Sequence, residues 1–244
     1  MILTIARREW AAAFKTPLGW LLLAASQLVL AWVFLQVLDQ FSGIEVPANT
    51  PGLNLALSHH LFGTAAVLLL LVAPLLGTRT LSTERREGTD QLLGAAPVTI
   101  AAVLLGKFLG VLVPLLLVAL LPPGLTLTLY GAAPVDAGLF LAATLGLALV
   151  ALLFAAVGLY AASLSAQPAL GTLLGYGILL FLSVLNRADQ LGADLVSVLD
   201  WLSWNQHLYW FLTGVVRLSD VGYFLLMTLL FLALTCRRLA NLRQ

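Results

Sequence analysis

Charged side chains are scarce in this sequence, which has only 12 basic and 11 acidic residues among 244. The composition is 61% hydrophobic and the mean hydropathy is +1.03. A soluble domain of this length needs more polar surface to cover its core, so these values exclude a soluble domain. The formal net charge of +1 gives no indication of a nucleic-acid partner. The single cysteine, Cys236, cannot form an intramolecular disulfide.

Motifs for catalysis and nucleotide binding are also absent. There is no Gly-x-x-x-x-Gly-Lys-Ser/Thr loop, no Gly-x-Ser-x-Gly elbow and no His-Glu-x-x-His pair. Of the 3 histidines, His59 and His60 are adjacent and would point in different directions, so they do not suggest a metal site. We therefore predict no catalytic, cofactor-binding or metal-binding residue in this chain.

Long apolar runs are what the sequence has in abundance. Each of six runs comes close to or exceeds the length that crosses about 30 Å of hydrocarbon, and their residues are apolar continuously rather than alternately, which favours helices over barrel strands. No Asp or Glu lies at the middle of these runs, which argues against ion-driven transport. We predict an all-α integral membrane protein, a single domain over residues 1–244, with six transmembrane helices near Leu18–Leu38, Leu61–Leu81, Val103–Leu125, Gly138–Ala162, Leu170–Leu185 and Val221–Cys236.

The basic residues are unevenly distributed between the two sets of connecting segments. Ten of the twelve fall on the side that also holds both termini, and only Arg187 and Arg217 fall on the other. Because basic residues are retained in the cytoplasm, we predict a multi-pass membrane protein with both termini inside.

Residues 2–15 predict an amphipathic helix lying on the membrane surface, with Trp10 and Phe14 on its apolar face and Arg7 and Arg8 at lipid headgroups. The alternative is an ordinary basic flank to the first span.

The third predicted helix carries its own signals. Thr99 is expected to be its N-cap, and Lys107 is expected to extend to the cytoplasmic face. Pro114 and the pair Pro122-Pro123 should bend or break it, either as part of a pathway or as a simple kink. Pro134 is expected to start the fourth helix.

Residues 186–219 are too apolar for a free loop and too interrupted for a full crossing. Their aromatic residues are typical of an interfacial or re-entrant helix at the outer surface. We predict that this outer aromatic segment contacts a partner or forms a gate through Trp201, Trp204, Tyr209, Trp210 and Phe211.

One dense polar segment, residues 82–95, follows the second span. Five charges lie between Glu84 and Asp90, in a chain in which only about 9% of the residues are charged. Such a charged helix either presents a docking surface to a soluble partner or simply fixes the topology. We name it the charged cassette; its candidate partner-binding residues are Glu84, Arg85, Arg86, Glu87, Gly88, Thr89, Leu92 and Leu93.

These features together resemble an ABC-2-type transporter permease of the gliding-motility-type branch. The resemblance covers nearly the whole chain and is strongest in three segments: Arg8-Glu9-Trp10 through Pro17-Leu18-Gly19-Trp20, the charged cassette with Pro97-Val98-Thr99 and Gly106-Lys107-Phe108, and Gly214 through Phe224. Asp90-Gln91 departs from the Leu-Glu that the family usually has. A related branch that serves nitrous-oxide-reductase maturation remains an alternative.

The resemblance implies a function and a set of partners. The charged cassette would be a cytoplasmic coupling helix that docks on an ATPase subunit, with acidic and basic side chains meeting opposite charges and Leu92 and Leu93 in an apolar groove. ATP and Mg²⁺ would bind to two separate ATPase subunits, and a second permease chain, identical or related, would complete the pathway. An auxiliary protein with an extracytoplasmic domain is a further possible partner, besides membrane lipids. The chain itself would be a non-catalytic permease of an exporter; the alternative is a complex that passes force to a periplasmic partner without moving a substrate.

Overall fold

The computed structural model describes residues 2–42, 52–86, 99–185 and 201–241, and these are almost entirely helical. Apart from an isolated bridge between Tyr130 and Ala133, the described residues contain no strand. The helices are α1 (Ile2–Lys15), α2 (Pro17–Ser42), α3 (Leu53–Leu57), the π-helix η1 (Ser58–Phe62), α4 (Gly63–Arg86), α6 (Ile100–Ala119), α7 (Leu121–Thr126), the 3₁₀-helix η2 (Leu127–Leu129), α8 (Ala137–Leu164), α9 (Pro168–Val184), α11 (Trp204–Leu212) and α12 (Leu218–Asn241).

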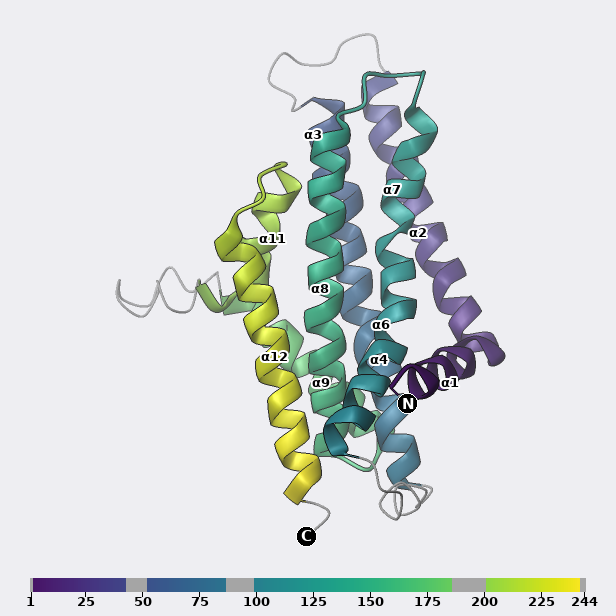
Figure 1. Ribbon diagram of the computed structural model, residues 1–244. Helices are drawn as coiled ribbons and strands as arrows, with labels where there is room; N and C mark the ends of the chain where they lie inside the picture. The colour runs from purple at the N-terminus through teal and green to yellow at the C-terminus, as the bar shows by residue number, and fades with distance from the viewer. Residues whose placement is uncertain (1, 43–51, 87–98, 186–200, 242–244) are drawn as a thin grey trace.

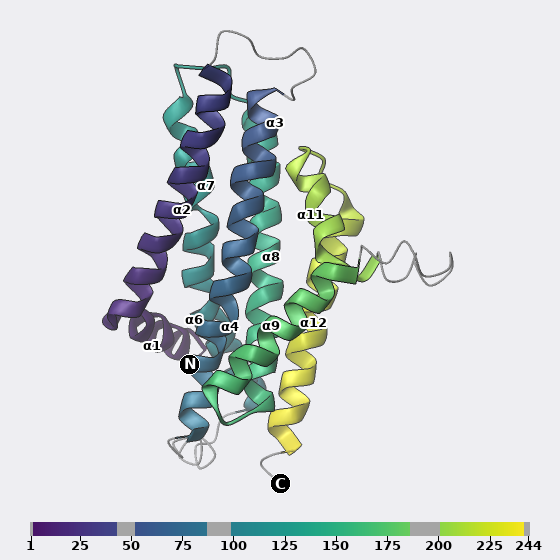
Figure 2. The same ribbon diagram turned by 180° about the vertical axis from the view of Figure 1, so that it is seen from behind.

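The long helices form an elongated bundle whose axis is vertical in Figures 1 and 2. α1 and the last turn of α12 lie at one end, which we call the terminal end; α3 and η2 lie toward the other, the distal end. α1 runs across the bundle at the terminal end rather than along it. α8 is the central helix and packs against α4, α6, α9, α11 and α12.

Five helical segments are long and apolar enough to cross a membrane: Pro17–Ser42, Leu53–Leu81, Ile100–Leu129, Ala137–Leu164 and Leu218–Asn241. These coincide with five of the six predicted spans. The remaining predicted span, Leu170–Leu185, coincides with α9, which has only 17 residues and is about 25 Å long at 1.5 Å per residue. The prediction of six full-length spans is therefore not confirmed.

α9 and α11 together follow the whole length of α8. Gly175 of α9 approaches Ala161 in the terminal half of α8, whereas the ring of Trp204 at the start of α11 lies 5.1 Å from that of Phe154 near its middle. Gly214, just after α11, then reaches Leu139 at the distal start of α8. The short helices α9 and α11 therefore run one after the other, both antiparallel to α8.

Local sequence signals place most helix boundaries. The Thr99 hydroxyl accepts a hydrogen bond from the Ala102 N–H at 3.4 Å, which confirms the predicted N-cap of α6. α6 ends at Ala119 and α7 begins at Leu121, so the chain breaks next to Pro122 as predicted, while Pro114 is accommodated inside α6.

The predicted start of the fourth helix at Pro134 is three residues early. α8 begins after Asp136, whose carboxylate accepts a hydrogen bond from the Leu139 N–H at 3.1 Å. An aspartate N-cap satisfies a free N–H group at the helix start, which a proline cannot do, so it sets the boundary here.

Candidate functional sites

The charged cassette begins on α4. This helix continues beyond the apolar span as far as Arg86, so the backbone of Glu84, Arg85 and Arg86 is helical and lies at the terminal end (Figure 1). The other candidate residues of the cassette, Glu87, Gly88, Thr89, Leu92 and Leu93, lie outside the described residues. The cassette thus leaves the bundle as an extension of a span-length helix, at the end where α1 lies.

Lys107 lies at the base of the cassette and contacts two other helices. Its side chain is only 2% exposed, and its Nζ donates to the carbonyl oxygen of Thr80 at 2.7 Å and to Glu9 Oε1 at 3.4 Å. The prediction that Lys107 extends to the membrane surface is therefore wrong. Glu9, brought in by α1, and a carbonyl of α4 hold the ammonium inside the protein, because a buried charge needs a counter-charge and acceptors.

Small residues on α6 allow this contact by letting α1 approach closely. A Cβ atom added at Gly106 would lie 2.8 Å from the Cβ of Ile5, and one at Gly110 would overlap the side chain of Glu9. The two glycines lie four residues apart, so they share one face of α6. Lys107 lies between them in the sequence. α1, α4 and α6 therefore form one packed unit at the root of the charged cassette.

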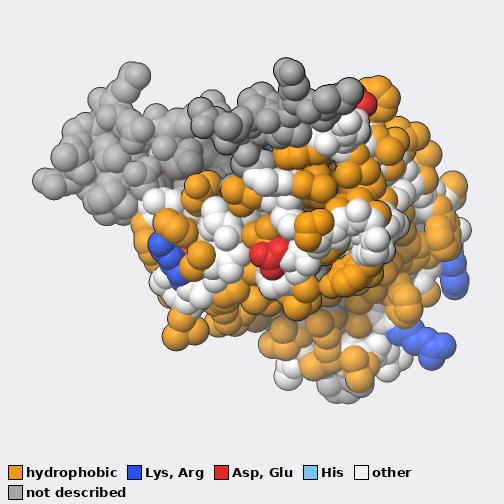
Figure 3. Space-filling view, turned by 90° about the horizontal axis from the view of Figure 1, so that it is seen from above, with side chains coloured by type: hydrophobic (Ala, Val, Ile, Leu, Met, Phe, Trp, Pro, Cys, Tyr) orange, Lys and Arg blue, Asp and Glu red, His pale blue; other side chains and the backbone are white. Residues whose placement is uncertain are grey.

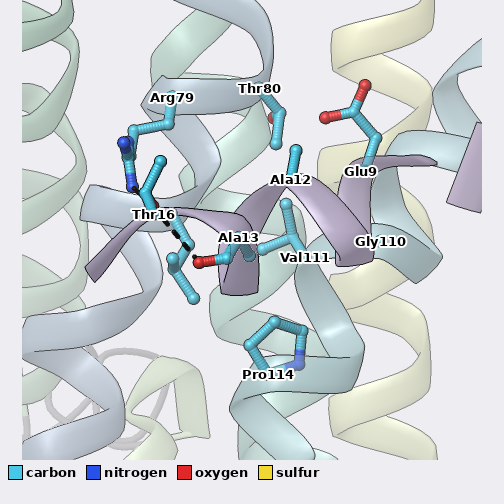
Figure 4. Close-up of a pocket in the computed structure, with 10 residues that line it drawn as sticks. Glu9, Ala12, Ala13, Thr16, Arg79, Thr80, Gly110, Val111 and Pro114 are labelled. Carbon is cyan, nitrogen blue, oxygen red and sulfur yellow. Dashed lines mark hydrogen bonds between the residues drawn. The ribbon is translucent and has the colours of Figure 1, made fainter. Parts of the chain in front are cut away.

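A cavity of about 210 Å³ lies along the seam of this unit (Figure 4). Arg79 of α4 lines it and donates to the Thr16 hydroxyl at 3.3 Å, and Glu9 lines it as well. Thr80 also lines it, and the remaining lining residues are apolar or glycine: Ala12, Ala13, Leu76, Gly110, Val111 and Pro114. Its polar groups serve to join α1 to α4, and among the described residues no group of three or more His, Cys, Asp and Glu side chains could hold a metal ion.

The five aromatic residues predicted to form a partner or gate segment differ in their exposure. Trp204 is 3% exposed and Phe211 is fully buried, the latter against Gly146 of α8, so both belong to the core. Tyr209 is 51% exposed and Trp201 49%. Trp210 is covered on one face by the Arg217 guanidinium, 3.2 Å from the ring centroid. α11 is thus packed into the bundle through one face, and the role of the segment as a partner surface or gate stays a prediction.

A buried polar cluster beside these aromatics was missed from sequence. His207 Nδ1 lies 2.7 Å from Asp220 Oδ1, and His207 Nε2 lies 2.8 Å from the carbonyl oxygen of Trp201. The imidazole also stacks on the Tyr223 ring, with 3.9 Å between centroids and 17° between planes. No sequence motif links these residues, since they come from α11, α12 and the turn before α11.

The cluster borders a cavity of about 440 Å³, which is also lined by Gln206, Trp210 and Arg217. Seen from the distal end, the uncovered surface is mostly apolar and carries few charged side chains (Figure 3). The His207–Asp220 pair is buried and joins α11 to α12.

The comparisons with known proteins agree with this architecture. The sequence pattern of a family described as ABC-2 family transporter protein matches residues 3–241. No curated protein shows significant sequence similarity to the chain.

Proposed function

Because the chain belongs to the ABC-2 family of transporter proteins and is thus a membrane subunit of an ABC transporter, we propose that it is the permease of an exporter and couples ATP hydrolysis by separate ATPase subunits to rearrangement of its helices. Members of this family are membrane components that associate with ABC ATPase subunits. The charged cassette is the proposed docking element, with Glu84, Arg85, Arg86 and Glu87 facing the ATPase. The gliding-motility-type branch is proposed on the three sequence segments described above.

The observation that carries the proposal is the packed unit at the terminal end. Lys107 ties α6 to the Thr80 carbonyl of α4 and to Glu9 of α1 just before α4 continues into the cassette. A displacement of the cassette by an ATPase subunit would therefore move α1, α4 and α6 together. Rigid-body movement of packed helices is one of the standard ways in which a local push becomes a global change.

The proposed complex has two permease chains and two ATPase subunits in the bacterial inner membrane, with the terminal end in the cytoplasm. ATP and Mg²⁺ belong to the ATPase subunits in this scheme. In this scheme α9 and α11 together make one crossing of the membrane, the fifth of six. An even number of crossings places both termini on the same side. α2 lies at the edge of the bundle and leaves Leu28, Trp32 and Leu35 exposed, a surface suited to lipid or to the second permease chain.

The double charge reversal Glu84→Lys with Glu87→Lys tests the coupling proposal. We expect the variant to insert normally and to lose the ATPase subunit, because two attractive contacts become repulsive. The measurement is co-purification from native membranes in mild detergent, with the bound chains identified by mass spectrometry.

Glu84→Asp with Glu87→Asp is the matched control, since it keeps both charges at the same positions, and it should retain the ATPase subunit. Normal recovery of an ATPase subunit with the double lysine variant would remove the coupling role of the cassette. Repeated recovery of the wild-type chain alone would contradict the wider proposal.

A second candidate function is force transmission to a periplasmic partner, favoured by the exposure of Tyr209 on α11, whose other face is packed into the core, and of Trp201 just before α11. Deleting the segment would not test it, because Trp204 and Phe211 are part of the fold. Tyr209→Ser removes an exposed ring alone. We expect it to leave the amount of folded protein unchanged; a force transmitter would lose its periplasmic partner, whereas an exporter would keep its ATP-dependent transport.

A further inference from the structure

The two ring nitrogens of His207 both face hydrogen-bond acceptors. Nε2 faces the carbonyl oxygen of Trp201, which can only accept, so Nε2 must carry a hydrogen and donate. Nδ1 faces a carboxylate oxygen of Asp220 at 2.7 Å, a distance typical of a charge-assisted hydrogen bond. A neutral imidazole has one N–H and could make both contacts only if Asp220 itself carried a proton.

The surroundings favour the proton on the imidazole. In water an imidazole binds a proton about two to three pH units more strongly than an aspartate carboxylate does. Asp220 lies in the first turn of α12, where the helix dipole favours a negative charge. Its second oxygen, Oδ2, is buried without a hydrogen-bond partner among the described residues, so within them the His207 imidazole is the group placed to balance a negative charge on Asp220. The stacked ring of Tyr223 adds a cation–π contact to a charged imidazole.

We propose that His207 and Asp220 form a proton-binding site that locks α11 to the start of α12. The bound proton makes His207 an imidazolium, which donates to Asp220 and to Trp201 at once. Removal of that proton leaves the Nδ1 lone pair of His207 facing the Asp220 carboxylate. Two buried acceptors then face each other without a hydrogen between them, which destabilises the contact. The junction is therefore closed at low pH and weakened as the pH rises, because the closed state binds one proton more than the open state.

Among the described residues, the other charged or titratable groups near the pair make contacts of their own. Arg217, which precedes α12, is engaged with the face of Trp210. The Tyr223 hydroxyl of α12 donates to the Leu202 carbonyl oxygen at 2.6 Å. From η1, the ring of His59 lies 5.5 Å from Tyr209 on α11. The described residues of α8 and α9 that meet the start of α11 are uncharged: Phe154 by ring contact and Ser183 by a hydrogen bond from Asn205.

The protonation state can be measured directly, whatever the protein transports. His59 and His60 are replaced by Gln, which leaves His207 as the only one of the 3 histidines. The full-length chain is labelled with ¹⁵N-histidine in lipid nanodiscs, and the imidazole nitrogen shifts are followed from pH 5 to pH 9. We expect both nitrogens to carry hydrogen at pH 6 and one hydrogen to be lost at higher pH. A neutral imidazole at pH 6 would overturn the proposal.

The lock itself is tested by Asp220→Asn. The asparagine amide can donate to Nδ1 while a neutral His207 donates from Nε2 to Trp201, so both contacts survive without an added proton. Hydrogen–deuterium exchange of the α11 amides, corrected for the intrinsic effect of pH, should accelerate about tenfold or more from pH 6 to pH 9 in the wild type and stay level in the variant. Equal pH dependence in the two proteins, or none in the wild type, would overturn the proposal.

Discussion

Replacing Lys107 by alanine is expected to lower the free energy of unfolding by about 3–5 kcal/mol, the usual result of removing one partner from a buried ion pair. The substitution leaves the Glu9 carboxylate without the ammonium 3.4 Å away and the Thr80 carbonyl without its donor at 2.7 Å. Arg8 still contacts Glu9 at 3.2 Å, but its side chain is 63% exposed, so water weakens that pair. The melting temperature of the purified chain in detergent, followed by tryptophan fluorescence, should fall by several degrees.

A double variant separates the charge effect from a packing effect. Glu9→Leu with Lys107→Met replaces the ion pair by apolar side chains of similar size, and such replacements are often neutral or stabilising. We expect the double variant to melt close to the wild type and above Lys107→Ala. If the double variant is as unstable as the single one, apolar side chains of similar size do not replace the ion pair, and the unpaired Glu9 carboxylate is not what destabilises Lys107→Ala.

Gly77→Ala is expected to destabilise the bundle by about 3 kcal/mol, the upper part of the range for an overpacked core. Gly77 of α4 and Gly158 of α8 face each other where these helices cross, and an added Cβ would lie 2.6 Å from the Gly158 carbonyl carbon. Backbone atoms cannot rotate out of the way as a side chain can. α4 and α8, the pair of helices with the most extensive contact in the bundle, would therefore have to move apart. Thermal unfolding and the yield of monodisperse protein in detergent measure the effect.

Gly177→Ala on α9 is the matched control, because a Cβ at this position meets no atom within 4 Å. It should melt at or slightly above the wild-type temperature, since alanine favours a helix over glycine by up to about 1 kcal/mol. A loss of stability of the same size in both variants would show that the close contact between α4 and α8 is not what Gly77 provides.

Features set by neighbouring residues were predictable. Helical spans followed from runs of apolar side chains, because a backbone in hydrocarbon must form its hydrogen bonds within each helix. The N-cap at Thr99 and the break beside Pro122 followed from the side-chain hydroxyl and the missing N–H. The start of α8 was misplaced because Pro134 and Asp136 are both plausible start signals, and the carboxylate at Asp136 wins by accepting a backbone hydrogen bond.

The candidate sites were predictable only in part. The charge density of the cassette is visible in the sequence, but the docking roles of Glu84 and Glu87 remain predictions. The aromatic segment was recognised as unusual, but its five rings were treated as one surface. The buried residues of α11, Trp204, His207, Leu208, Phe211 and Leu212, follow the spacing of a single helix face, a pattern that separates Trp204 and Phe211 from the exposed Tyr209. His207 and Asp220 lie 13 residues apart, and nothing local indicates that they are paired.

The sequence by itself determined that this chain is a membrane protein of long apolar helices with one charged segment, because composition and the length of apolar runs depend on no distant contact. Only the tertiary structure decided that Lys107 is buried against Glu9, that α9 and α11 follow one another along α8, and that His207 faces Asp220. The physical reason is that burying a charge costs more than a single helix can offset. Whether a charged side chain extends to water or stays inside therefore depends on the partner that another helix brings to it.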